Sequence, residues 1–211
     1  ALLTFAGAWL RGPAGDQTGL PGPLDDGSWS SFANGDRIAQ VLPEGAVLWI
    51  ASAGGGVLRW NVVDGTYRQY LAPQDGLPSN AVNSLYRDLD GTLWAATDRG
   101  LAWLPSGMER WSALTPRQSP DMPSERVTAL VGDGQGGLWV GFAQSWDAER
   151  SNPRTAEKGA FTQGGLARFR TSDRTWSDVT HVTKDGGPAR EDYTTLPSEN
   201  ITALAALPDG T

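Results

Sequence analysis

The residues best suited to chemistry lie in two long segments in the second half of the chain. The first segment, Phe142–Gly164, and the second, Thr180–Asn200, combine carboxylates and basic side chains with aromatic ones. An exposed Trp beside such groups is typical of carbohydrate or peptide binding, because the flat ring covers an apolar ligand face while polar groups bind hydroxyls. The residues that we expect to bind a ligand are Trp146, Asp147, Arg150, Arg154, His181, Asp185, Arg190, Glu191, Asp192 and Tyr193.

Two other interpretations of these segments stay open. The segments can pack on each other, with Trp146 as their small core. They also offer catalytic chemistry, since His181 is a candidate general base and Glu191 with Asp192 a candidate acid/base pair of a polysaccharide lyase or hydrolase. The single His and the absence of Cys favour a noncatalytic protein. We therefore assign no catalytic residue, no metal ligand and no cofactor, and keep an enzyme as the alternative.

The composition limits which kinds of molecule we expect the protein to bind. The 211 residues carry 17 basic and 24 acidic side chains, a net charge of −7, which argues against nucleic acid as the main partner. A hydrophobic content of 39% indicates a folded core. The sequence has no apolar run long enough for a complete transmembrane helix.

The chain repeats with a period typical of β-propeller blades. The pair Leu-Trp recurs with 45 residues between successive copies, at Leu48-Trp49, Leu93-Trp94 and Leu138-Trp139. Each unit divides into four short alternating runs, which in the second unit are Ala81–Arg87, Thr92–Ala96, Leu101–Leu104 and Glu109–Ala113. Alternating runs between Gly, Asp and Pro turns predict strands, and four strands per unit predict one blade. We expect Trp49, Trp94 and Trp139 to be buried at equivalent positions, each filling the wedge between neighbouring blades.

The second unit resembles a known repeat. Residues 75–82 (DGLPSNAV), 90–97 (DGTLWAAT) and the following Gly100-Leu101 are similar to the two-component regulator propeller repeat, and the resemblance extends over about residues 29–211. It implies an extracytoplasmic, all-β propeller of four-stranded antiparallel blades, of a kind found in bacterial sensor proteins that include membrane histidine kinases sensing saccharides. It specifies the blade and leaves the function open.

Both long segments fall on the same face of the predicted propeller. If the strands of a unit run from the inside outwards, the first and third turns of each blade share one face and the remaining connections share the other. The two insertions of the third unit belong to that second group. Insertions gathered on one face often mark the binding face, so we expect a small-molecule, saccharide or protein ligand there.

The blades account for most of the chain but not for its beginning. Residues 1–28 combine an apolar start with a Gly- and Pro-rich stretch, which we interpret as an export-signal remnant or an N-terminal arm followed by a linker. We expect a partial propeller over residues 29–211, with blades at about 36–70, 80–113 and 126–179 and the start of another at 200. This makes about three complete blades plus parts of flanking ones, an open arc that we expect to be a fragment of a longer protein.

The sequence thus favours a noncatalytic, periplasmic or extracellular propeller that binds a ligand or partner, as the input region of a signalling protein. A saccharide-like ligand fits the candidate residues, and a membrane tether outside this fragment fits the resemblance. A polysaccharide lyase or hydrolase and a structural spacer are the alternatives.

Overall fold

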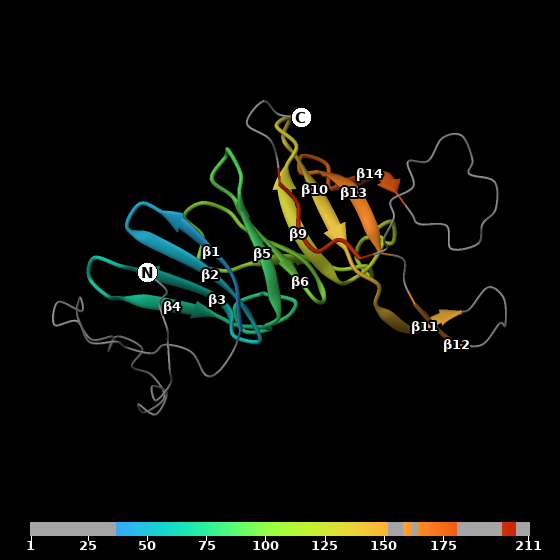
Figure 1. The fold of residues 1–211 in the computed structure, drawn as a ribbon, viewed down its shortest axis with the longest axis horizontal. Coiled ribbons are helices and arrows are strands. Elements are labelled where there is room, and N and C mark those ends of the chain that lie inside the picture. Colours follow the sequence, from blue (N-terminus) through green and yellow to red (C-terminus); the bar gives the residue numbers. More distant parts are fainter. Residues whose placement is uncertain (1–36, 152–157, 162–163, 181–199, 206–211) are drawn as a thin grey trace.

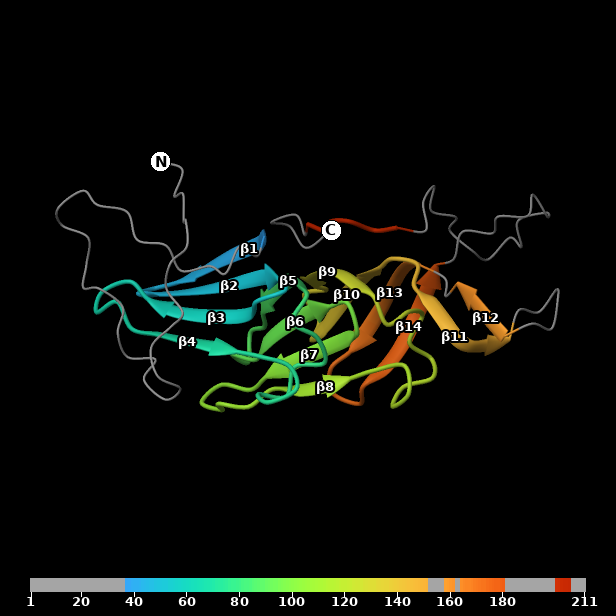
Figure 2. The same cartoon turned by 90° about the horizontal axis from the view of Figure 1, so that it is seen from below.

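The protein is built from β-strands arranged in an arc of four-stranded sheets. The computed structural model describes residues 37–151, 158–161, 164–180 and 200–205, and every named element in these ranges is a strand (Figures 1 and 2). Three sheets have four antiparallel strands each, and a fourth sheet is a two-stranded hairpin. The fold predicted from the sequence, an open part of a β-propeller with three complete blades, is therefore confirmed.

Each four-stranded sheet corresponds to one sequence unit. The first sheet contains β1 (Arg37–Glu44), β2 (Val47–Ala53), β3 (Gly56–Asn61) and β4 (Tyr67–Tyr70). The second contains β5 (Val82–Arg87), β6 (Leu93–Thr97), β7 (Gly100–Leu104) and β8 (Ser112–Leu114). The third contains β9 (Val127–Gly132), β10 (Gly137–Phe142), β13 (Gly165–Arg170) and β14 (Thr175–Thr180).

The long connection between β10 and β13 is more regular than the sequence indicated. It contains the hairpin of β11 (Trp146–Ser151) and β12 (Lys158–Phe161), in which Trp146 is paired with Phe161 and Asp147 with Ala160. Figure 2 shows this hairpin beyond the outer strands of the third sheet. Because adjacent strands are antiparallel, the hairpin lies at the opposite strand ends from the β9–β10 turn.

The three sheets share one register. The strand neighbours of Trp49 are Leu42 and Arg59, those of Trp94 are Tyr86 and Trp103, and those of Trp139 are Val131 and Arg168. The Leu before each Trp is likewise paired at equivalent places. The repeat seen in the sequence is thus a repeat of three-dimensional positions.

Adjacent residues of the middle sheet enter two different cores. On β6, Leu93 and Ala95 pack with Trp49 between the first and second sheets, whereas Trp94 and Ala96 pack with Leu138 between the second and third. This follows from the strand period of two, because successive side chains point to opposite faces. The Leu of each Leu-Trp pair therefore faces the preceding sheet, and the Trp faces the following one.

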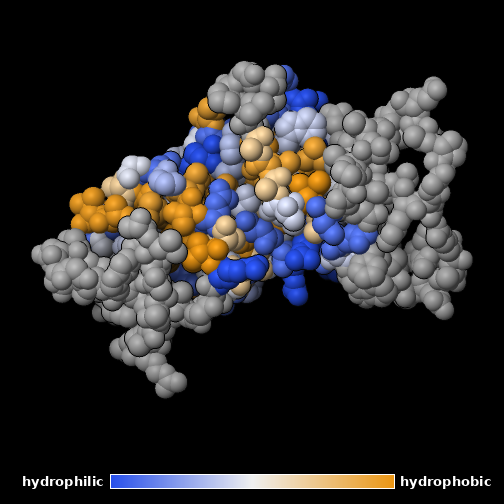
Figure 3. Space-filling view, viewed as in Figure 1, coloured by the Kyte–Doolittle hydropathy of each residue, from blue (hydrophilic) through white to orange (hydrophobic). Residues whose placement is uncertain are grey.

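The prediction that all three Trp side chains are buried is wrong for one of them. Trp49 and Trp94 are 6% and 5% exposed, but Trp139 is only partly buried. Trp139 lies on the face of the third sheet that points away from the second, and the described residues include no further four-stranded sheet on that side. Leu48 lies on the face of the first sheet that points away from the second, and it too is only partly buried. The surface over the first sheet also displays hydrophobic side chains (Figure 3), including Ile38 and Val41 of β1.

Polar side chains join the innermost strands of neighbouring sheets. The Gln40 amide donates to Leu85 O at 3.1 Å and accepts from Leu85 N at 2.7 Å. In the next sheet, Asn83 Nδ2 donates to Val127 O at 2.8 Å. These bonds satisfy edge backbone groups that a four-stranded sheet leaves unpaired. The segment 200–205 contacts the third sheet similarly, because Ile201 N donates to Phe142 O at 3.1 Å and Thr128 Oγ1 donates to Ile201 O.

The Asp-Gly-Leu-Pro-Ser-Asn connection between the first two sheets is built from specific hydrogen bonds. Asp75 Oδ2 accepts from Leu71 N at 2.8 Å, and Asp75 O accepts from Trp111 N at 2.8 Å. Asn80 Oδ1 accepts from Ala72 N at 2.6 Å. Gly76 has φ +90°, and a Cβ there would lie 2.0 Å from Trp111 O. Because any side chain at position 76 would collide with the Trp111 carbonyl, only glycine lets the connection pass this close to the second sheet.

We expect Gly76→Ala to destabilise the fold much more than Gly107→Ala. Both glycines have positive φ, but a Cβ at Gly107 meets nothing within 4 Å. Gly107→Ala should cost only the backbone term of about 1–2 kcal/mol, while the clash at Gly76 should raise the loss to about 3 kcal/mol or more. Urea unfolding of both variants measures this. Equal losses would contradict the close contact of Gly76 with Trp111.

We expect Trp94→Ala to cost about 3–5 kcal/mol of unfolding free energy, because its ring is enclosed between two sheets. Trp139→Ala should cost about 1–2 kcal/mol, because the ring buries less area. Denaturant unfolding followed by far-UV circular dichroism measures both. A larger loss at Trp139 than at Trp94 would refute the assigned directions of the two rings.

Candidate functional site

The ligand-binding residues predicted from the sequence fall at the edge of the described structure or outside it. Trp146, Asp147 and Arg150 belong to strand β11. Their backbone lies on the hairpin inserted between β10 and β13. The remaining predicted residues lie outside the described residues: Arg154, His181, Asp185, Arg190, Glu191, Asp192 and Tyr193. Their role in binding stays a prediction.

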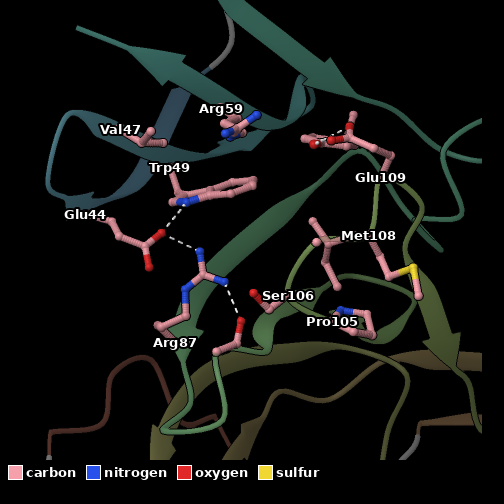
Figure 4. A pocket seen from close by; sticks show the side chains of 13 residues that line it. Glu44, Val47, Trp49, Arg59, Arg87, Pro105, Ser106, Met108 and Glu109 are labelled. Carbon is pink, nitrogen blue, oxygen red and sulfur yellow. Dashed lines mark hydrogen bonds and ion pairs between the residues drawn. The ribbon is translucent and has the colours of Figure 1, made fainter. Parts of the chain in front are cut away.

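The described residues form a pocket elsewhere, between the first and second sheets (Figure 4). Its volume is about 250 Å³, and both sheets contribute to its walls. The first sheet supplies Glu44, Val47, Trp49, Arg59 and Tyr70, and the second supplies Arg87, Gly91, Leu104 and the connection 105–109 between β7 and β8. The lining includes Glu44 and Val47, the strand residues on either side of the β1–β2 turn, and Gly91 of the β5–β6 turn. The pocket is therefore at the opposite strand ends from the connections that correspond to the hairpin insertion.

Trp49 is the aromatic wall of this pocket. Its Nε1 donates to Glu44 Oε2 at 2.9 Å, and its ring stacks on Tyr70 with centroids 6.1 Å apart. The Arg59 and Arg87 guanidinium carbons lie 5.8 and 5.4 Å from the ring centroid, and Figure 4 shows the two arginines on opposite sides of the indole. Cation–π attraction therefore adds to the hydrogen bond in fixing the ring.

Glu44 connects the first sheet to the second. Its Oε2 atom, already bonded to Trp49, lies 2.5 Å from the Arg87 Nη2 atom. Arg87 also donates from Nη1 to Gly91 O at 2.8 Å. The Arg87 side chain is 23% exposed and that of Glu44 is 48% exposed, so solvent screens this charge-assisted bond on the Glu44 side. The three bonds together nevertheless hold the polar wall of the pocket in place before any ligand binds.

The other wall carries Glu109, on the connection between β7 and β8. Glu109 Oε2 accepts from Tyr70 Oη at 3.3 Å and lies 3.3 Å from Arg68 Nε. Burial raises the pKa of the Tyr70 phenol, and the Glu109 carboxylate raises it further. The phenol is thus kept protonated at neutral pH and remains a donor to Glu109.

The residue beside the recurring Trp position differs between the first two sheets. Arg59 stands beside Trp49 on β3, where the second sheet has Trp103 beside Trp94. Trp103 packs at 5.7 Å from Trp94, which also contacts Phe169 at 5.8 Å. Aromatic rings thus pack together between the second and third sheets, whereas Arg59 lines the pocket beside Trp49.

The third sheet has an arginine at the same position, but with a dedicated partner. Arg168, beside Trp139, lies 2.6 Å from Asp133 Oδ2 and also donates to Gln135 Oε1 at 3.0 Å. Asp133 stands in the third sheet where Glu44 stands in the first, since each is opposite the residue before its Leu-Trp pair. In the first sheet that carboxylate is bonded to Arg87 instead.

Sequence reasoning assigned Trp49 to the core and missed the pocket. An alignment of the sequence units points to the pocket, because Arg59 aligns with Trp103 of the second unit. Glu44 and Arg87 gave no such signal, because they are 43 residues apart and meet only through sheet packing.

The described ranges offer neither a metal centre nor a membrane helix. No group of three or more His, Asp or Glu side chains in them is arranged to hold a metal ion. Within the same ranges, no helix has the length and hydropathy of a membrane span.

Comparison with known proteins confirms the family resemblance. Residues 76–99 match the model of the two-component regulator propeller. This stretch runs from Gly76 of the connection described above, through β5 and β6 with Leu93 and Trp94, to the turn before β7. None of the curated proteins compared with the chain matches it.

Solved structures with a similar fold include two extracellular domains from B. thetaiotaomicron. That of BT3049, described as a hybrid two component system, has 18% identity and a TM-score of 0.49 over 76% of this chain and 26% of its own. That of BT4673, described as a one component system, has 14% identity and a TM-score of 0.48 over 82% of this chain and 25% of its own. The chain thus spans about a quarter of the length of these domains.

The Asp133–Arg168 pair predicts a pH dependence of stability. Burial by itself raises the pKa of Asp133, but hydrogen bonds from Gln135 N, Gly137 N and Arg168 outweigh it and hold the pKa below its usual value of 3.8. A lowered folded-state pKa adds stability above the unfolded pKa, and this contribution is lost as the pH falls through the folded pKa.

We expect Asp133→Asn to lower the unfolding free energy at pH 7 by about 1–3 kcal/mol. The difference from the wild type should begin to shrink as the pH falls below about 4, where the unfolded-state carboxylate becomes protonated, and should be lost once the pH is below the lowered folded-state pKa. Urea unfolding between pH 2 and pH 7 measures it. A difference independent of pH would contradict an ionised, hydrogen-bonded Asp133.

Proposed function

We propose that the protein is a noncatalytic, exported propeller module that binds a small ligand and forms the input region of a signalling protein. The observation that carries this proposal is the pocket between the first two sheets, with its aromatic wall, two guanidinium groups and two carboxylates. Such a combination of one ring and a few placed polar groups suits a polar ligand with an apolar face. The two-component regulator propeller match of residues 76–99 supports the signalling role.

The position of the pocket fits a sensor because both neighbouring sheets line it. A ligand that touches Trp49 and Arg59 on one side and the 105–109 connection on the other contacts two blades at once. Binding energy can then favour one arrangement of the blades over another, which is the requirement for transmitting occupancy. A saccharide is the ligand class that we favour, since its ring can cover the indole while hydroxyls bind the charged groups.

The residues predicted from the sequence belong to a second candidate surface. The hairpin carrying Trp146, Asp147 and Arg150 lies at the opposite strand ends, and we propose that it contacts a larger ligand or a protein partner. The periplasmic or extracellular location and a membrane anchor are also part of this proposal, and they rest on the family resemblance.

The proposal is tested by titrating the purified chain with a panel of neutral and acidic mono- and disaccharides. Binding is followed by Trp fluorescence and calorimetry, and the ligand is recovered and analysed afterwards. We expect saturable binding with the saccharide chemically unchanged. Turnover of the bound saccharide, or absence of binding across the panel, would refute a noncatalytic saccharide-binding module.

A pocket-filling variant with a matched control locates the site. Ser106 is exposed and lines the pocket on the β7–β8 connection, and Ser172 is exposed on the corresponding β13–β14 turn of the third sheet. We expect Ser106→Trp to weaken binding at least about tenfold, because the indole occupies the ligand volume, while Ser172→Trp leaves affinity within about twofold. Unchanged affinity in Ser106→Trp would exclude the pocket as the binding site.

A further inference from the structure

Arg59 has donors in the pocket that no neighbouring side chain uses. Among the described residues, none forms a hydrogen bond or ion pair with its guanidinium in the structure. Arg59 is an exposed residue, and its guanidinium carbon lies 5.8 Å from the centroid of Trp49 on the lining of the pocket. Its planar fork of N–H donors matches the two oxygens of a carboxylate.

The third sheet provides an internal comparison. At the equivalent position, Arg168 binds the Asp133 carboxylate at 2.6 Å. The equivalent carboxylate of the first sheet, Glu44, is already held by Arg87 at 2.5 Å and by Trp49 Nε1 at 2.9 Å. The same backbone position therefore carries a paired arginine in one sheet and an unpaired one in the other.

Among the described residues, the charged groups around the pocket leave one cation, Arg59, without an acidic partner. Glu44 pairs with Arg87, and Glu109 pairs with Arg68 at 3.3 Å. Arg59 is the remaining charged group of the pocket lining. A negative group on the ligand would complete this pattern, while the Trp49 ring and the side chains of Val47, Pro105 and Met108 offer apolar surface to the rest of the molecule.

We propose that the pocket recognises a small monocarboxylate, whose carboxylate binds Arg59 and whose ring or apolar body lies along Trp49. This rests on the proposed function and adds the chemical class of the ligand. A uronic acid and an aromatic carboxylate share this chemistry, and both would place a carboxylate on the guanidinium with a ring beside the indole.

The test compares two matched pairs of probes. Glucuronate is titrated against glucose, and benzoate against benzyl alcohol, with the wild type, Arg59→Gln and Arg99→Gln. Arg99 is exposed on the β6–β7 turn, away from the pocket lining, so its variant has the same loss of charge without loss of the proposed contact. Circular dichroism and the urea midpoint confirm that both variants are folded.

We expect the wild type to bind at least one carboxylate about tenfold more tightly than its neutral partner, with an affinity that falls as salt is added. Arg59→Gln should remove this preference and Arg99→Gln should keep it. Glucuronate binding alone would identify a sugar acid and support both proposals. Benzoate binding alone would support the carboxylate contact with Arg59 but refute the saccharide class favoured under the proposed function.

Three results would overturn the carboxylate proposal. These are equal binding of charged and neutral probes, a carboxylate preference that survives Arg59→Gln, and binding of none of the four probes. A neutral saccharide that binds the pocket with no carboxylate preference would refute the carboxylate proposal while leaving the saccharide-binding module intact. The saccharide panel with Ser106→Trp decides that broader question separately.

Discussion

The structure depends on the opposite directions of two adjacent side chains, Leu and Trp, on the second strand of each sheet. In a β-strand neighbouring residues point to opposite faces, so one Leu-Trp pair contributes to two separate cores. Leu93 packs toward the first sheet and Trp94 toward the third. The second sheet is thereby linked to both neighbours. Within the described residues the first and third sheets each pack against the second alone, and one member of each pair, Leu48 or Trp139, is only partly buried.

The candidate pocket is a local variation on this arrangement. Every sheet presents its Trp to the next one, and the residue beside that Trp determines how the intervening space is filled. Trp103 fills it with an aromatic ring, and Arg168 is neutralised by Asp133. Arg59 does neither, because the Arg87 side chain of the next sheet has taken the nearby carboxylate. The same repeat can thus form a closed core at one place and a ligand site at another.

Much of the fold was accessible from the sequence because its information is local. Alternating runs, Gly turns and the Leu-Trp spacing identify strands and blades within a few residues of each other. The second-unit runs differ from the observed strands mainly at their ends, as for Glu109–Ala113, where the strand is Ser112–Leu114. The sequence predicts a loop at Trp146, where the structure has a hairpin whose register shifts between Asp147 and Ser151.

The site was much less accessible, for a physical reason. The Glu44–Arg87 bond and the approach of Glu109 to Tyr70 join residues 43 and 39 apart, and only the packing of two sheets brings them together. The exposure of Trp139 likewise depends on what lies beside its sheet rather than on its own sequence. An alignment of the repeats shows that Arg59 replaces an aromatic residue. It cannot show that Glu44, the carboxylate expected to bind Arg59, is bonded to Arg87.

The most direct test of the central claim is a pair of double-mutant cycles on neighbouring residues of β6. Trp94 contacts Phe169 of the third sheet with ring centroids 5.8 Å apart, whereas Leu93 points to the other core. Combining Trp94→Leu with Phe169→Leu should give a coupling energy of about 0.5–1.5 kcal/mol in urea unfolding. Combining Leu93→Ala with Phe169→Leu should be additive within about 0.5 kcal/mol. Coupling of Leu93 to Phe169 with additivity of Trp94 would show that the register, and the packing built on it, are wrong.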